Sequence, residues 1–167
     1  MERKLELRDI AGYLPYGVFA KFYDINFISK IDFASVGCLL SGKEPMRMIL
    51  RPLPDLYKPI IHNGKEEVPM LELAKITFGT ELFDVAKNVT DALIPFVEVV
   101  SKNNNSLLHF FYDCGQFKVN MIHGKCELHC NQFPLFDYLH SRFIDYRRLI
   151  DAGLAISVYD LENNPYK

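Results

Sequence analysis

A segment with three prolines constrains this chain more than any other part of its sequence. Pro52, Pro54 and Pro59 lie between Met48 and Ile60, and each lacks a backbone donor and favours extended geometry in the residue before it. No long helix and no central strand can continue through such a segment. Because its apolar residues still require burial, we expect a fixed crossing segment between two parts of the fold rather than a flexible linker.

The composition indicates a folded domain. Hydrophobic residues make up 49% of the 167 residues and aromatic residues 13%, far from the content of disordered chains. Burying one large apolar side chain contributes roughly 1.5–3 kcal/mol. The 13 Phe and nine Tyr can therefore supply a core without disulfides. We expect one compact domain over residues 1–167, with a possible subdivision into a strand-rich part, 1–60, and a mixed part, 61–167.

The charge pattern and the lack of export signals predict a cytoplasmic protein with no membrane partner. The net charge is −2 and charges of both signs are interspersed, which gives no broad field for nucleic acid or an anionic membrane. The first residues lack the apolar core of a signal peptide, and no stretch approaches the roughly 20 apolar residues of a membrane span. Four cysteines in such a chain are most simply reduced thiols.

Short strands separated by turn residues are expected before the proline segment. Gly12 would end a short helix, and Pro15 and Gly17 favour a tight turn. Aromatic and β-branched runs bounded by turn residues then predict a small antiparallel sheet. The expected strands cover residues 18–23, 25–31, 33–40 and 47–51.

After the proline segment, turn residues and periodicity predict a mixture of helices and strands. Asn63-Gly64 favours a type I′ hairpin because both residues tolerate positive φ. Pro69 suits the first turn of a helix that Gly79 would end. Apolar residues at three-to-four spacing predict a second helix over residues 80–93, and residues 96–100 suit either strand or helix. Further expected elements are a three-stranded meander over 107–130, a helix over 133–143 and a shorter helix between Asp145 and Gly153.

These elements together predict an α+β fold. The expected order is an N-terminal antiparallel sheet, the proline crossing, two central helices, a second meander and the C-terminal helices.

Four residues near position 126 could hold zinc. His123, Cys126, His129 and Cys130 offer the imidazole and thiolate ligands that zinc prefers. On one strand, however, Cys126 and Cys130 share a face while His129 points to the other. The alternative is that the cysteines are small, half-buried apolar residues. Protein that is equally stable in chelator would exclude zinc as a cofactor.

A thiol-dependent enzyme is another alternative for the region from Cys114 to Cys130. A nucleophilic thiol needs a nearby base and an electropositive pocket. Cys130 follows His129, but neighbouring residues of a strand face opposite ways and form no dyad by themselves. The sequence contains no phosphate-binding glycine loop and no nucleophile-elbow motif. It therefore identifies no catalytic residue.

Basic and aromatic residues form two candidate contact surfaces. Residues 42–65 carry five Lys or Arg against two acidic residues, and they include Arg47, Arg51 and Lys58. Arginine beside exposed aromatic rings can bind phosphate and stack on bases, whereas the alternative is an ordinary solvated face whose Arg stems cover apolar surface. The second surface consists of Tyr138, Arg142, Tyr146, Arg147 and Arg148.

Several stretches resemble a family of short uncharacterised proteins encoded by phages and prophages of gut anaerobic bacteria. They are LRDIAGYLPYG at 7–17, ILRPLPDL at 49–56, NGKEEVP at 63–69, ELAK at 72–75, FDYLH at 136–140 and LIDAGLAI at 149–156. The resemblance implies an intracellular context and a phage accessory role. It offers no catalytic residues to carry over, and it does not extend to residues 81–131, where the Cys/His cluster lies.

The residues and the resemblance together favour a non-enzymatic accessory protein that binds a host protein or nucleic acid. The alternative function is a small zinc-binding or thiol-dependent enzyme that uses the region from Cys114 to Cys130.

Overall fold

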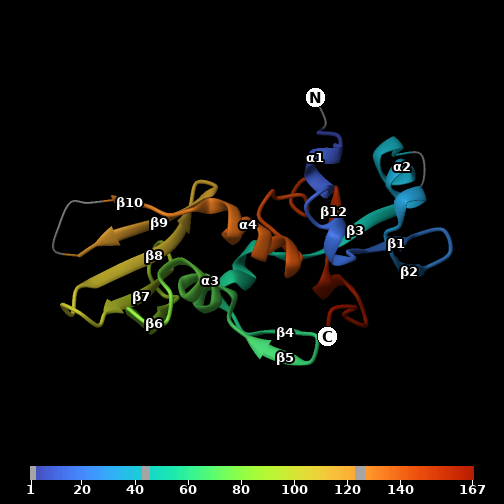
Figure 1. Cartoon of the computed structure of the whole chain (residues 1–167). Coiled ribbons are helices and arrows are strands. Elements are labelled where there is room, and N and C mark those ends of the chain that lie inside the picture. The colour runs from blue at the N-terminus through green and yellow to red at the C-terminus, as the bar shows by residue number, and fades with distance from the viewer. Residues whose placement is uncertain (1–2, 43–45, 123–126) are drawn as a thin grey trace. The chain divides into compact units, whose positions relative to one another are not determined.

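The computed structural model of the chain describes residues 3–42, 46–122 and 127–167. Helices and sheets both occur along the chain, which confirms the predicted α+β class (Figure 1). The chain divides into two units. The first consists of Met1–Leu53 and Leu139–Lys167, and the second of Pro54–Tyr138.

β3 (Met46–Pro52) is the strand on which the first unit is built. It pairs antiparallel with β1 (Phe19–Phe22), which in turn pairs antiparallel with β2 (Phe27–Lys30). Two short strands from the end of the chain, β11 (Ile144–Asp145) and β12 (Ala155–Ser157), pair with β3 in the parallel direction. The sheet is therefore mixed, and β3 ends at Pro52, where we expected the missing donor to stop it.

The helices of the first unit include one segment that we had predicted as a strand. α1 (Leu7–Ile10) and the 3-10 turn η1 (Leu14–Tyr16) precede β1, and α2 (Phe33–Ser41) follows β2. The predicted strand over 33–40 is wrong because end signals outweigh the short apolar run. Asp32 caps the first turn by accepting a hydrogen bond from the Ser35 backbone N–H (2.8 Å), and Gly42 takes the left-handed conformation that ends a helix (φ 61°).

The last residues of the chain are part of the core of the first unit. Tyr166 is 3% exposed, and its hydroxyl donates to the carbonyl of Ile49 (2.7 Å) and accepts from the N–H of Phe19 (3.1 Å). Its ring stacks on that of Phe143, with 4.0 Å between centroids. The core around it is formed by residues of α1, β1, β3 and β12.

The second unit begins with the elements predicted around Asn63-Gly64 and Pro69. After the 3-10 turn η2 (Leu53–Tyr57), β4 (Ile60–His62) and β5 (Lys65–Glu67) form a hairpin. Asn63 (φ 50°) and Gly64 (φ 75°) both adopt positive φ, which confirms the predicted turn. α3 (Pro69–Phe78) follows and is ended by Gly79.

The rest of the second unit is a five-stranded antiparallel meander whose strands pair in sequence order. The predicted helix over 80–93 is wrong, because residues 83–89 form the first of these strands. Phe83 and Val85 lie on its more buried side and alternate with exposed neighbours, so the period is two rather than 3.6. The strands are β6 (Phe83–Val89), β7 (Phe96–Ser101), β8 (Leu107–Asp113), β9 (Gln116–Met121) and β10 (Glu127–His129).

After the meander, α4 (Gln132–Ser141) confirms the predicted helix over 133–143. The shorter helix predicted after Asp145 is not formed. That segment makes turns, in which the Asp145 carboxylate accepts from the N–H groups of Leu149 (2.9 Å) and Ile150 (2.7 Å). The 3-10 turn η3 (Val158–Asp160) follows β12 directly. Across the described residues, no helix is both long enough and apolar enough to pass through a membrane.

Candidate functional site

The structure divides the predicted contact residues between the two units. Arg47, Arg142, Tyr146, Arg147 and Arg148 belong to the first unit, as does Arg51. Arg51 is only 2% exposed and its guanidinium lies 5.7 Å from the ring centroid of Tyr166. It therefore belongs to the core and not to a contact surface.

Lys58 and Tyr138 belong to the second unit. Lys58 is exposed. The Tyr138 hydroxyl donates to the carboxylate of Glu67 (2.9 Å) in the β4–β5 hairpin, so its polar group has a partner within its own unit.

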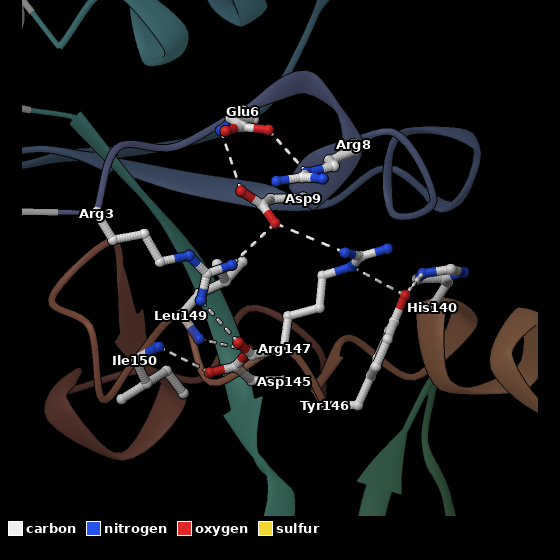
Figure 2. A network of polar contacts seen from close by, with 10 residues as sticks. All are labelled: Arg3, Glu6, Arg8, Asp9, His140, Asp145, Tyr146, Arg147, Leu149 and Ile150. Atoms are coloured by element: carbon white, nitrogen blue, oxygen red, sulfur yellow. Dashed lines mark hydrogen bonds and ion pairs between the residues drawn. The ribbon is translucent and has the colours of Figure 1, made fainter. Parts of the chain in front are cut away.

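The predicted surface around Arg147 proves to be a polar network within the first unit (Figure 2). The buried carboxylate of Asp9 accepts a hydrogen bond from Arg3 (2.9 Å) and lies 3.7 Å from a guanidinium nitrogen of Arg147. Arg147 also donates to the hydroxyl of Tyr146 (3.1 Å), which lies 2.9 Å from Nε2 of His140. These contacts join α1 to the end of α4 and the turn after β11, so Tyr146 and Arg147 have a structural role.

Asp145 is a second buried carboxylate of this network (Figure 2). Burial raises its pKa, and the hydrogen bonds from the N–H groups of Ile150 and Leu149 partly offset that increase. Because its oxygens already accept two backbone hydrogen bonds, Asp145 holds the turn after β11 in place.

A different group of basic residues has no such carboxylate. Lys21 on β1 and Arg47 on β3 are directly paired across the two strands. The Lys21 ammonium lies 5.6 Å and the Arg47 guanidinium 5.8 Å from the ring centroid of Tyr23, which is 43% exposed. Within the part of the chain that the structure describes, neither cation has an acidic group within 4.0 Å. We call Lys21, Tyr23 and Arg47 the basic surface.

Like charges placed opposite each other destabilise a sheet by roughly 0.2–1 kcal/mol. The shared aromatic ring offsets part of this cost, since a cation near an exposed ring gains about 0.5–1 kcal/mol. An anion bound between Lys21 and Arg47 would remove the repulsion altogether. The basic surface is therefore better suited to an anionic ligand than the network around Arg147.

The distribution of arginine agrees with this location. All seven arginines of the sequence fall in the first unit, which holds 12 Lys and Arg against ten Asp and Glu. The second unit has seven lysines against 11 acidic residues and no arginine. The first unit is therefore net positive although the whole chain has a net charge of −2. A positive unit attracts anionic ligands locally.

The sequence alone predicted Arg47 but missed Lys21 and Tyr23. A strand over 18–23 and another over 47–51 were both expected. The two strands are β1 and β3, which β2 and α2 separate along the chain. Only the register between them brings these residues together, and no short turn fixes that register.

The thiols of Cys114 and Cys130 are poorly suited to nucleophilic catalysis. The Cys130 thiol donates to the carbonyl of Phe117 (3.1 Å), and burial raises its pKa. A nucleophilic cysteine needs the opposite shift. Cys114 lies exposed in the turn between β8 and β9, and its thiol donates to the Asp113 carboxylate (3.3 Å).

The predicted zinc ligands lie mostly beyond what the structure describes. His123 and Cys126 fall outside the described residues, and His129 is placed only as a backbone position of β10. The described residues contain no group of three or more His, Cys, Asp or Glu that could hold a metal ion. Zinc binding through His123, Cys126, His129 and Cys130 thus stays a prediction.

Comparisons of this chain with protein-family models, with curated proteins and with solved structures each found no match.

Proposed function

We propose that this chain is a non-enzymatic binding protein for nucleic acid and that it binds through the basic surface. The observation that carries the proposal is the pairing of Lys21 with Arg47 beside the ring of Tyr23, with no acidic partner among the described residues. The β1–β3 pairing places the backbones of the two residues opposite each other, and both charged groups lie near the ring of Tyr23.

Each residue of the basic surface has a role in this proposal. Lys21 and Arg47 bind neighbouring phosphate oxygens, Lys as a point charge and Arg through a planar fork of donors. The exposed ring of Tyr23 offers a stacking platform, which is worth roughly 1–3 kcal/mol per base in proteins that bind single strands. Such binding tolerates many sequences, because every base has a π-face.

The resemblance to phage and prophage proteins supports an accessory role in the same proposal. A host protein is the alternative partner, and it would meet the same three side chains.

Fluorescence anisotropy with a labelled single-stranded oligonucleotide of mixed sequence tests the proposal. We expect the double variant Lys21→Glu/Arg47→Glu to bind at least about tenfold more weakly than the wild type, since two attractive charges become repulsive. The slope of log affinity against log salt should fall in magnitude by about 1–2, one to two phosphate contacts being lost.

The matched control is Lys65→Glu/Lys87→Glu, which reverses two exposed lysines of the second unit. It should retain nearly all of the affinity. If the two double variants weaken binding equally, or if the wild type binds no oligonucleotide, the proposed function is wrong.

A further inference from the structure

A cavity of about 350 Å³ around Cys130 in the second unit is lined mainly by apolar groups. A second cavity, in the first unit, is larger and is also lined by charged side chains. It encloses about 530 Å³, within the 300–1,000 Å³ of sites for small ligands. Four segments line it: residues 3–5, the end of α2 with Gly42, the start of β3, and Gly153 with Leu154.

Three cations and no carboxylate line this cavity among the described residues: Arg3, Lys4 and Arg47. Arg3 is held in place by Asp9 (2.9 Å) and by the carbonyl of Arg147 (3.0 Å), as Figure 2 shows. Lys4 and Arg47 have no acidic group within 4.0 Å in the described parts of the chain. The cavity therefore carries two cations beyond the one that Asp9 already neutralises.

Apolar side chains also contribute to the walls of the cavity. They are Leu5, Leu39, Leu40, Met46 and Leu154, and Ser41 adds the one hydroxyl. A small inorganic anion would leave most of this volume and most of these walls unused. The lining fits a ligand in which a strongly charged group is joined to an organic group of some size.

Arg47 belongs both to this cavity and to the basic surface. A strand of nucleic acid that ends at Arg47 would place its terminal nucleotide in the cavity. A terminal phosphate monoester carries a charge of about −1.5 to −2 at pH 7, whereas an internal phosphate carries only −1. Lys4 and Arg47 are the residues that would read this extra charge.

We propose that the cavity binds a phosphate monoester joined to an organic group of nucleotide size, with Lys4 and Arg47 on the phosphate. If the phosphate belongs to the end of a bound strand, the inference rests on the proposed nucleic-acid binding. If it belongs to a free nucleotide, the inference is independent of that function.

The same cations have a second physical role, because the C-terminal end of α2 carries a partial negative charge that attracts them. If that were their whole role, replacing them would lower the thermal stability without changing the binding of phosphate monoesters. Melting temperature is therefore measured on every variant beside binding.

The test is calorimetric titration of the wild type with adenosine 5′-monophosphate and with adenosine. We expect the monophosphate to bind at least about tenfold more tightly, since only the phosphate gains charge-assisted hydrogen bonds. Lys4→Ala/Arg47→Ala should abolish this preference, and Lys65→Ala/Lys87→Ala, at two exposed lysines of the second unit, should retain it. Equal binding of the two probes, or a preference that survives Lys4→Ala/Arg47→Ala, would overturn the inference.

A second pair of probes identifies the source of the phosphate. These are one oligonucleotide with a 5′-phosphate and the same oligonucleotide with a 5′-hydroxyl group. A preference for the phosphorylated strand that Lys4→Ala/Arg47→Ala removes would assign the cavity to strand ends. Equal binding of both strands, with the monophosphate preference intact, would assign it to a free nucleotide. The difference between the two strands reports on strand-end recognition, and the binding of either strand reports on the proposed nucleic-acid binding. The two can therefore fail separately.

Discussion

The two units of this protein differ in how distant their interacting segments are along the chain. In the second unit, β6 to β10 pair in sequence order, so each strand meets the one before it. In the first unit, Tyr13 donates to the carbonyl of Ile144 across 131 positions, and Tyr166 bonds Phe19 across 147. The first unit therefore depends on its two chain ends meeting, and the second does not. Local pairing costs less loop entropy and favours faster folding.

The C-terminal tail is therefore the segment on which the first unit depends most. Replacing a buried aromatic residue by alanine typically costs about 3–5 kcal/mol, so we expect Tyr166→Ala to reduce the stability of the first unit by that amount. Hydrogen exchange followed by mass spectrometry should show the loss in β1 and β3, with β7 and β8 still protected. Tyr159→Ala, at a site 64% exposed, is the matched control and should change stability by less than about 0.5 kcal/mol. Equal loss of protection in both units would show that they unfold as one.

Alkaline pH should lower the stability of the second unit through the ionisation of Tyr57. Burial raises the pKa of Tyr57 to about 12. Between pH 10 and 12 the folded state then holds a proton that the unfolded state has lost, so stability falls as pH rises. One such group accounts for about 3 kcal/mol over this range. Circular dichroism of unfolding at pH 9 to 12 should give a shallower decline for Tyr57→Phe than for the wild type. Parallel declines would remove Tyr57 as the cause.

The junction between α1 and α4 can be loosened by a single methyl group. A Cβ added at Gly12 would lie 2.2 Å from Cε1 of His140, whose ring contacts Tyr13 edge-on (4.8 Å). We expect Gly12→Ala to cost about 1–3 kcal/mol in urea unfolding, because the His140 ring would have to leave its contacts with Tyr13 and Tyr146. Gly37→Ala in α2 meets no atom within 4 Å and should instead stabilise by about 0.5–1 kcal/mol. A neutral result at Gly12 would mean that His140 turns aside freely.

Mild acid should produce the smallest difference in stability between the two units, with the loss in the second unit. Burial lowers the pKa of His109, and the Glu98 carboxylate, 3.9 Å away, only partly offsets this. Below the ordinary His pKa the unfolded state binds the proton more readily, so stability is lost as pH falls through about 6.5. The pKa of Asp145 in the first unit is raised, so its contribution improves as pH falls. Exchange rates in β8 should rise between pH 7 and 5 after correction for intrinsic chemistry, and less so in His109→Gln.

The sequence by itself determined the local elements whose signals lie within a few residues. Pro52 ends β3, Asn63-Gly64 forms the hairpin turn, and the strands from 107 to 129 follow their alternation. Arg47 was recognised as a contact residue because basic residues are dense around it. In these cases the covalent structure restricts φ and ψ directly, or residues next to one another share one face.

The tertiary structure decided what depends on distant partners. Residues 83–89 carry apolar positions that suit either period, and pairing with β7 selects the strand. Arg51 and Arg47 stand on one strand four residues apart, yet Arg51 is buried near Tyr166 while Arg47 stays exposed. The basic surface exists only because β1 and β3 pair in the register that places Lys21 opposite Arg47. Register between strands that are far apart in sequence is fixed by side-chain burial across the whole sheet, and no short stretch of sequence contains it.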